Sequence, residues 1–385
     1  MSTAYSVAGV SIPIAPPTAY RLSPTESFPH SLNPRLRHLG RVECGNNPDR
    51  LAGNEGRLST LLVYPSDSPK RYSKRPSSMS IRKRHHFLPV FYLNRFLNPA
   101  GRFFQFDLRF EITPNPIRTT PQNVGVESYL YSPGLGPDPR DETLEAWLGK
   151  HVDAPAAPVV AKLCDGQVLS TAEQYLLSRF LVAQRLRTPS HRDLTLSDAQ
   201  RRAERLVEEW RQDRSMMRKH IREAHSAAGH PPDQATAEIN HWEALFDSGD
   251  EIGVSTLKTF WLNLIAQSIK ETSTRFGGLQ YLVFEPPSGR EFCTSDSPVL
   301  RRYTNPLLRR VGGEPGWLSP ATEISLPLAP DRMLLIGWEL EAPVDLVEWW
   351  ETWRRDLLWA ADRFLISREL PTWVRLELAM NPHPA

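Results

Sequence analysis

Three short motifs carry the side chains best suited to chemistry: the pair His85 and His86, Arg187 near the end of an apolar helix, and Asp296 between two serines. A neutral imidazole serves as a general base or a metal ligand. A guanidinium binds phosphate or carboxylate with two parallel hydrogen bonds. A carboxylate binds a metal or orients a histidine. Brought together, these groups would suit a reaction on an anionic substrate.

Adjacent histidines cannot both face one site. Neighbouring residues point to opposite faces of a strand and diverge by about 100° on a helix. We therefore take His86 as the candidate base or metal ligand and His85 as a candidate ligand contact. The alternative is structural, with a buried histidine capping the turn before Pro89 or packing beside Phe87.

The arginine belongs to a helix with a clear start. Ser170 and Glu173 have the spacing of a capping box, and the helix is expected to run to about Arg187 before Pro189 ends it. Arg187 falls on the apolar face, where an unpaired charge would be too unfavourable to persist. Its partner is a carboxylate of the protein (Asp153 or Asp296), the anionic group of a ligand, or the orphan carbonyls of the helix end.

Asp296 follows a predicted strand and precedes a turn, which is a common place for functional groups. It binds a metal or orients a histidine, or it stabilises the bend locally, as Asp and Ser before proline often do. The candidate catalytic residues are therefore His86 and Asp296, and the candidate ligand-binding residues are His85, Gln184, Arg187 and Ser295.

The elements that must position these residues change character along the chain. Helical patterns fill the middle and strand patterns gather after residue 277, which indicates an α+β fold with an antiparallel or mixed sheet formed largely by C-terminal strands. The predicted helices span 141–163, 170–187, 197–227, 235–246, 256–271 and 344–361. The predicted strands span 102–108, 279–284, 291–294, 324–328, 333–338 and 364–367. The Pro-Pro-Ser-Gly sequence at 286–289 predicts a hairpin between the second and third of them.

Residues 1–78 are rich in Pro, Ser, Asn, Gly and Arg and lack a sustained apolar period. Such a segment buries too little apolar area to offset its ordering entropy. We expect a disordered tail or a mis-assigned upstream start, with translation beginning at Met79 and a single α+β domain over 79–385.

Composition excludes several classes of protein. The net charge of +2 argues against a bulk electrostatic attraction to nucleic acid or membrane, and no apolar run is long enough to span a bilayer. The three cysteines lie far apart, with no zinc spacing, as in a reducing compartment, so we expect a cytoplasmic protein. The chain has no P-loop, GxGxxG, HExxH or GxSxG motif.

The segment His85–Phe96 (HHFLPVFYLNRF) resembles the opening signature of a bacterial family known as domain of unknown function 4238. Further similar motifs follow in order at 184–189, 294–299 and 326–330. The chain departs from the family pattern at Val90 (usually Gln), at Ser297 (usually Asn) and at Asp153, the nearest counterpart of a usual Glu. The resemblance implies kinship and leaves the activity unassigned.

Two functions and a structural alternative fit these residues. The first is a metal-assisted hydrolase or nuclease that acts on an anionic small molecule or nucleic acid, with a divalent metal as the candidate cofactor. The second is a non-catalytic module that binds a ligand or a protein through the same pocket. The third treats the polar residues as a structural network. The first predicts that His86, Arg187 and Asp296 converge.

Overall fold

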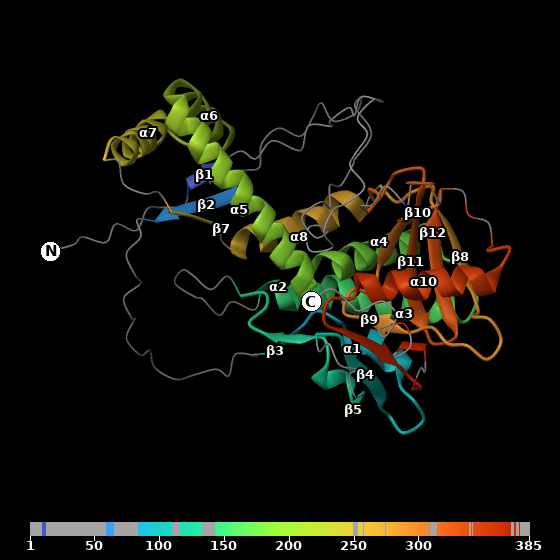
Figure 1. The fold of residues 1–385 in the computed structure, drawn as a ribbon. Helices are drawn as coiled ribbons and strands as arrows, with labels where there is room; N and C mark the ends of the chain where they lie inside the picture. Colours follow the sequence, from blue (N-terminus) through green and yellow to red (C-terminus); the bar gives the residue numbers. More distant parts are fainter. Residues whose placement is uncertain are drawn as a thin grey trace.

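The computed structural model describes residues 84–109, 116–132, 143–248, 258–273, 275–305, 307–308, 314–338, 340 and 342–370, residues 373, 374 and 377, and three further strands at 10–12, 59–64 and 253–256. Helices from the middle of the chain pack on antiparallel sheets built largely from C-terminal strands (Figure 1). The predicted α+β class is confirmed.

The helices occupy most of the middle of the chain. They are α1 (Val90–Leu93), α2 (Thr143–Leu148), α3 (Ala154–Cys164), α4 (Thr171–Leu186), α5 (Pro189–Gln212), α6 (Arg214–Ala227), α7 (Pro232–Asp247), α8 (Lys258–Ser273) and α10 (Leu346–Ala360). A π-helical turn, Gly149–Asp153, joins α2 to α3. In the described part of the chain, no helix is long and apolar enough to cross a membrane.

The strands of the described residues form four antiparallel sheets. One has the order β10-β11-β12-β8, with β8 at Gln280–Phe284, β10 at Leu300–Tyr303, β11 at Thr322–Ala329 and β12 at Arg332–Gly337. Another has the order β5-β4-β13-β9, with β4 at Phe103–Asp107, β5 at Ile117–Thr119, β9 at Thr294–Ser295 and β13 at Phe364–Ser367. A two-stranded ribbon pairs β3 (Arg84–His86) with β6 (Val126–Ser128). The fourth sheet has the order β1-β2-β7, with β1 at Val10–Ile12, β2 at Ser59–Tyr64 and β7 at Gly253–Thr256.

The predicted hairpin across residues 286–289 is wrong. β8 pairs with β12, and β9 pairs with β13. The turn-forming residues bend the chain locally, but strand pairing is decided by burial, because residues 333–337 of β12 are all buried and β8 covers that edge. After the bend, the amide of Phe292 donates to the Pro330 carbonyl at 2.8 Å.

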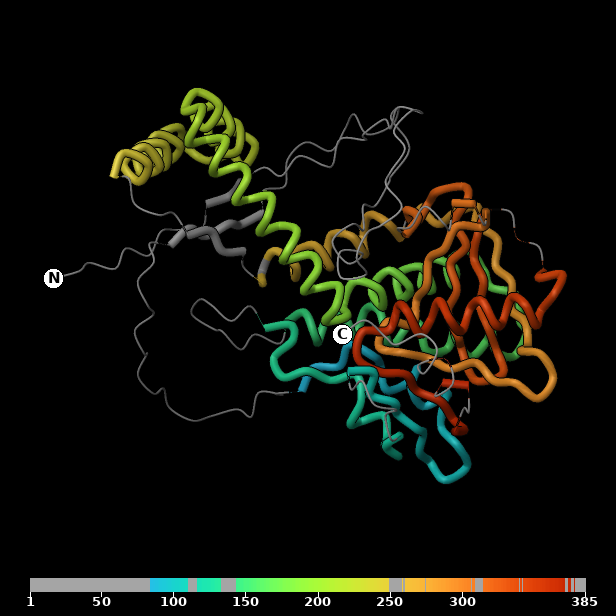
Figure 2. The backbone as a smooth tube through the Cα atoms, viewed as in Figure 1, coloured from blue at the N-terminus to red at the C-terminus, as the bar shows by residue number. Residues whose placement is uncertain are grey.

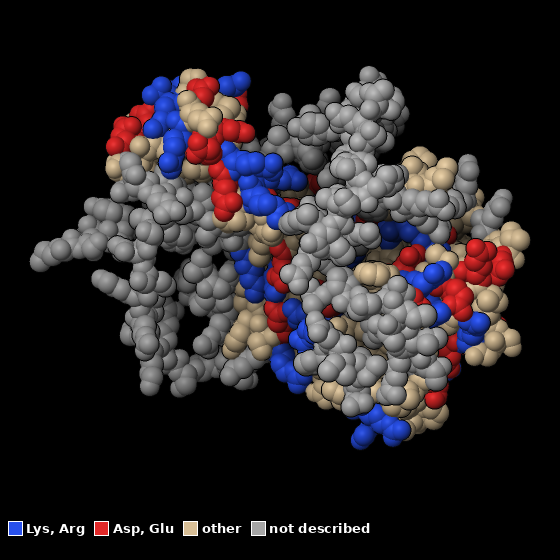
Figure 3. Space-filling view, in the orientation of Figure 1, with Lys and Arg blue, Asp and Glu red and all other residues tan. Residues whose placement is uncertain are grey.

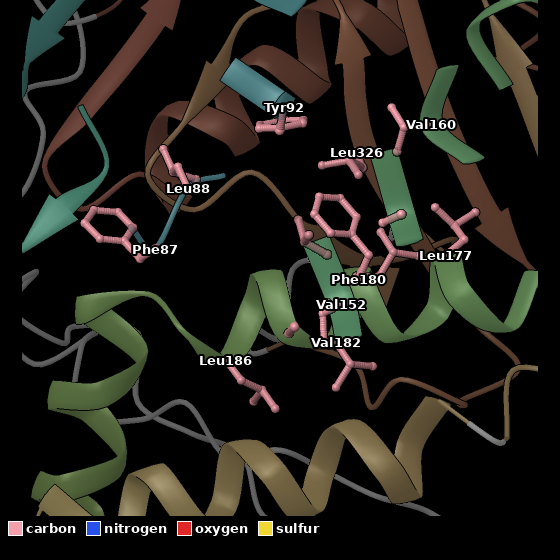
Figure 4. Close-up of a cluster of buried hydrophobic side chains, with 14 of the residues drawn as sticks. Phe87, Leu88, Tyr92, Val152, Val160, Leu177, Phe180, Val182, Leu186 and Leu326 are labelled. Carbon is pink, nitrogen blue, oxygen red and sulfur yellow. The ribbon is translucent and has the colours of Figure 1, made fainter. Parts of the chain in front are cut away.

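The main core lies around α4. Figure 4 shows Phe180 and Leu177 of this helix packed close to Leu326 of β11, with Tyr92 of α1 near them. The buried Tyr92 hydroxyl donates to the Pro327 carbonyl at 2.9 Å and shares a 2.7 Å hydrogen bond with Thr294, which ties α1 to both large sheets. A second cluster packs α10 against β4, β12 and β13.

The long helix predicted over 197–227 is two helices. Asp213 leaves helical conformation, and its carboxylate accepts hydrogen bonds from the amides of Ser215 and Met216, which starts α6. α5, α6 and α7 form an arm that projects from the rest of the chain (Figure 2), and they share a small core around Trp210 and Trp242. Basic and acidic residues intermingle over this arm (Figure 3).

Two strands lie within the segment predicted to be a tail. β1 (Val10–Ile12) pairs with β2 (Ser59–Tyr64), and β2 pairs with β7 (Gly253–Thr256). Nothing in the sequence pattern led us to expect these strands. The rest of residues 1–78 lies outside the described residues, so the proposed start at Met79 stays a prediction.

Candidate functional site

The junction between α4 and α5 gathers much of the polar chemistry. The capping box at the start of α4 forms as predicted. At the other end, Thr188 caps α5, and its Oγ1 accepts a 3.3 Å hydrogen bond from the amide of His191. Pro189 therefore ends α4 and also occupies the first turn of α5, where its missing N–H has no consequence. The polar side chains of residues 184–192 leave this junction in different directions.

Arg187 is fully buried and has a carboxylate of its own. Its Nη1 donates to both oxygens of Asp153 at 2.9 and 3.0 Å, and its Nη2 donates to the Gln184 amide oxygen at 2.7 Å. Gln184 in turn donates to the Phe87 carbonyl at 3.0 Å. Of the partners considered from the sequence, the structure shows Asp153. Burial raises the pKa of Asp153, and the Arg187 charge opposes that shift.

The two histidines diverge along β3 as adjacent strand residues must. His85 is buried, its Nδ1 accepts a 3.0 Å hydrogen bond from the Tyr131 amide, and its ring stacks on Tyr131 at 5.7 Å. Tyr131 stacks on Trp261 at 6.0 Å. His86 is half-buried, and its amide donates to Glu145 of α2 at 3.3 Å while its carbonyl accepts from the Tyr131 hydroxyl at 3.2 Å.

Tyr131 connects the histidines to the Arg187 pair. Burial raises the pKa of its hydroxyl, the Arg187 charge lowers it, and the charges of Glu145 and Asp153 raise it. The hydroxyl thus binds the backbone of His86 and is within electrostatic range of Arg187. Sequence reasoning missed Tyr131 and Glu145, because neither stands in a motif and their roles depend on tertiary contacts.

Asp296 belongs to a different part of the fold. Its two oxygens accept hydrogen bonds from the amides of Asp362 at 3.0 Å and Arg363 at 2.7 Å, just before β13. Burial raises the pKa of Asp296 to about 7, the Asp362 charge adds to the shift, and the amides and Arg363 oppose it. This carboxyl therefore holds the start of a strand.

The carboxylate of Asp296 does not join His86 and Arg187 in one site. Within the described part of the chain, the hydrogen bonds of the Asp296 carboxylate run to the amides of Asp362 and Arg363, and none joins it to His86 or Arg187. Ser295 accepts a 3.0 Å hydrogen bond from the Ser297 amide, as expected for a turn before proline. The link from Asp296 to α5 is indirect and runs through Arg363, which binds Glu127, which also binds Arg192.

A second arginine of α4 forms a cluster that the sequence did not predict. Nη2 of Arg185 and Nη2 of Arg301 lie 2.8 and 2.7 Å from the same oxygen, Oε2 of Glu314. Their side chains are only 9% and 2% exposed, so both charges are held away from solvent. The Arg301 guanidinium lies 4.8 Å from the centre of the Trp317 ring. The one sequence signal was an arginine pair, 301–302, in a stretch that proves to be a buried strand.

His191 stands beside this cluster in the first turn of α5. It is half-buried, and its Nδ1 shares a 3.2 Å hydrogen bond with Thr195. Burial and the charges of Arg185 and Arg301 lower the pKa of His191 to about 3, against a smaller opposing effect of Glu314. The imidazole is therefore neutral at physiological pH, and the two arginine charges oppose its protonation.

No three His, Cys, Asp or Glu side chains within the described ranges are grouped as a set that could hold a metal ion. The polar junction of α4 and α5 contains buried arginines, their carboxylate partners and a neutral histidine.

An α+β protein with an arginine-rich helix junction is the class that the fold and site define. Residues 84–346 match the family described as "Protein of unknown function (DUF4238)", and this match covers well over half of the chain. The chain belongs to that family, which confirms the resemblance of its opening motif. No curated protein and no solved structure matches the chain.

Proposed function

We propose that this protein binds a small anionic molecule at the pair Arg185 and Arg301, through a phosphate or carboxylate group of the ligand. The observation that carries the proposal is that both buried guanidinium groups reach a single oxygen of Glu314. A phosphate has several anionic oxygens and would offer each guanidinium its own, so it would match the pair better than the one shared oxygen does.

The contrast with Arg187 supports this choice of site. Arg187 meets both oxygens of Asp153 and also Gln184. Arg185, in contrast, shares one carboxylate oxygen with Arg301. The buried Nε of Arg185 has no hydrogen-bond partner among the described residues, and the same holds for the Nε of Arg187. A buried donor without a partner costs about 1–3 kcal/mol, which an anionic ligand oxygen would relieve.

The start of α5 adds to the attraction. The α-helix has 24 residues, and its N-terminal turn, capped by Thr188, carries His191 next to the arginines. The positive end of a helix macrodipole favours an anion there. Trp317 holds Arg301 from the other side through the face of its ring, so the clamp is oriented before a ligand arrives.

A second candidate, a hydrolase for an anionic ester, is favoured by His191. Its neutral imidazole lies beside the two cations that would hold the substrate. The negative charge of a bound ester would offset the charges of the two arginines and raise the basicity of the imidazole. The ring would then accept a proton from water as the water oxygen attacks the ester, and would return it to the departing alcohol oxygen, while the arginines stabilise the negative charge that develops. The metal-assisted reaction expected from the sequence, with His86, Arg187 and Asp296, is a different candidate and stays a prediction.

Thermal unfolding with inorganic phosphate tests the binding proposal. The full chain is heated in phosphate and in chloride at equal ionic strength. We expect phosphate to raise the unfolding temperature of the wild type and of the control Arg355→Gln, whose arginine is exposed on α10, and not that of Arg185→Gln. Equal shifts in all three proteins would contradict the proposal. A hydrolase would in addition release product from a phosphate ester, and His191→Gln would lose that activity.

A further inference from the structure

The turn between α6 and α7 ends α6 in a Schellman motif. The amide of His230 donates to the His225 carbonyl at 2.9 Å, and the amide of Gly229 donates to the Ser226 carbonyl at 3.1 Å. Gly229 has φ 71°, the left-handed conformation that this motif requires at its second-to-last position and that glycine adopts without strain. The backbone of the turn is therefore fixed by its own hydrogen bonds.

This motif brings two particular side chains together. The residue three positions inside the helix end and the residue two positions beyond it usually make an apolar contact. Here they are His225 and His230. Their ring centres lie 5.1 Å apart, and their Nδ1 atoms lie 3.3 Å apart. The usual apolar pair has been replaced by two converging imidazole nitrogens.

The spacing of these nitrogens fits a metal ion. With metal–nitrogen distances of about 2.0–2.1 Å, two nitrogens 3.3 Å apart subtend an angle of about 107° at the metal. The tetrahedral angle is about 109°. Without a metal, one Nδ1 must donate a proton to the other, because two lone pairs facing each other at this distance repel.

Glu238 of α7 prepares His225 for this role. Its Oε2 lies 2.7 Å from His225 Nε2, and both side chains are largely buried, at 12% and 14% exposed. A carboxylate on one ring nitrogen keeps the proton there and leaves the lone pair of the other nitrogen available, as it does behind metal-bound histidines. His230 is exposed, so an ion has access from solvent.

We propose that His225 and His230 bind a late divalent transition-metal ion, such as Zn²⁺, Ni²⁺ or Cu²⁺, through their Nδ1 atoms. Neutral imidazoles suit these ions better than Mg²⁺ or Ca²⁺. Water completes the coordination, and the ion joins the end of α6 to the turn that leads into α7. The site lies on the arm and is independent of the anion site.

Calorimetric titration of the full chain with ZnCl₂ tests the site. We expect one ion per chain for the wild type and for the control His241→Ala, which removes an exposed histidine of α7. His230→Ala should weaken binding at least tenfold, and Glu238→Gln should weaken it about 10- to 100-fold. His230 is exposed, so its replacement leaves the core of the arm intact.

Cobalt gives a second readout. Co²⁺ bound to the wild type should show visible absorption bands of a low-symmetry nitrogen site, and His230→Ala should lose them. The proposal is overturned if the wild type binds no Zn²⁺, if His230→Ala binds it as tightly as the wild type, or if His241→Ala loses it equally.

Discussion

Arg185 and Arg187, two residues apart at the end of α4, bind different carboxylates: Arg185 binds Glu314, far towards the C-terminus, and Arg187 binds Asp153, which precedes α4. Positions two apart on a helix differ by about 200°, so the two guanidiniums leave α4 on different sides. One pairs with a carboxylate of its own and the other shares an oxygen with Arg301. We assign Arg187 a structural role, and we propose that Arg185 binds a ligand.

Arg187→Ala should destabilise the protein strongly. It leaves Asp153 and Gln184 without their partner in the core, and breaking a buried ion pair from one side costs about 3–5 kcal/mol. The free energy of unfolding in urea measures the loss. Arg211→Ala is the control, because Arg211 and Glu208 are exposed and 3.9 Å apart, and it should change the free energy by less than about 1 kcal/mol. A similar small change for Arg187→Ala would refute the structural role.

Asp296 should make stability fall as pH rises from about 4 to about 7. Its folded pKa of about 7 lies above the ordinary value of 3.8, so across this window the folded state holds a proton that the unfolded state has released. Each unit of difference corresponds to about 1.4 kcal/mol. The free energy of unfolding of the wild type, minus that of Asp296→Asn, should decrease with pH. A difference that is constant, or that grows with pH, would show that the carboxyl is charged throughout.

His191 should have the opposite effect. Its folded pKa of about 3 lies below the ordinary value of 6.5, so stability from this group is present above pH 6.5 and is lost as pH falls towards 3. His191→Gln should reduce that acid sensitivity. The imidazole resonances in an NMR titration give the direct measurement. They should stay those of a neutral ring at pH 5, and a midpoint near 6.5 would be inconsistent with the cluster as described.

Removal of residues 1–78 should leave a soluble protein that unfolds cooperatively. The described residues of the cores around α4 and α10 all lie after residue 84, and the family match starts at residue 84. The loss of β2 removes the described partner of β7, so local protection from hydrogen exchange should fall there. Aggregation of the truncated chain, or a broad transition without cooperativity, would contradict this prediction.

Local signals in the sequence were sufficient for much of the fold. The capping box of Ser170 and Glu173 defines the start of α4 by contacts within one turn, and the short apolar run of β12 is typical of a buried strand. Strand partners could not be predicted in this way. The pairing of β8 with β12 depends on burial of a whole face, which the turn at 286–289 does not encode.

The site was predictable only where a residue's environment followed from its own helix. Arg187 lies on an apolar face, so its need for a partner was evident, and Asp153 was one of two carboxylates considered. Arg185 points away from that face and gave no such signal. Its partner Glu314 lies far along the chain, and only the tertiary fold brings Arg301 and Glu314 to it.

Calorimetric titration with inorganic phosphate tests the central claim most directly, on the wild type, Arg185→Gln and Glu314→Gln. Glu314 occupies the guanidinium pair that the ligand needs, so its neutral replacement should bind phosphate more tightly than the wild type, while Arg185→Gln should not bind it measurably. Binding of phosphate by Arg185→Gln with wild-type affinity, or no binding by Glu314→Gln, would contradict an anion site at Arg185 and Arg301.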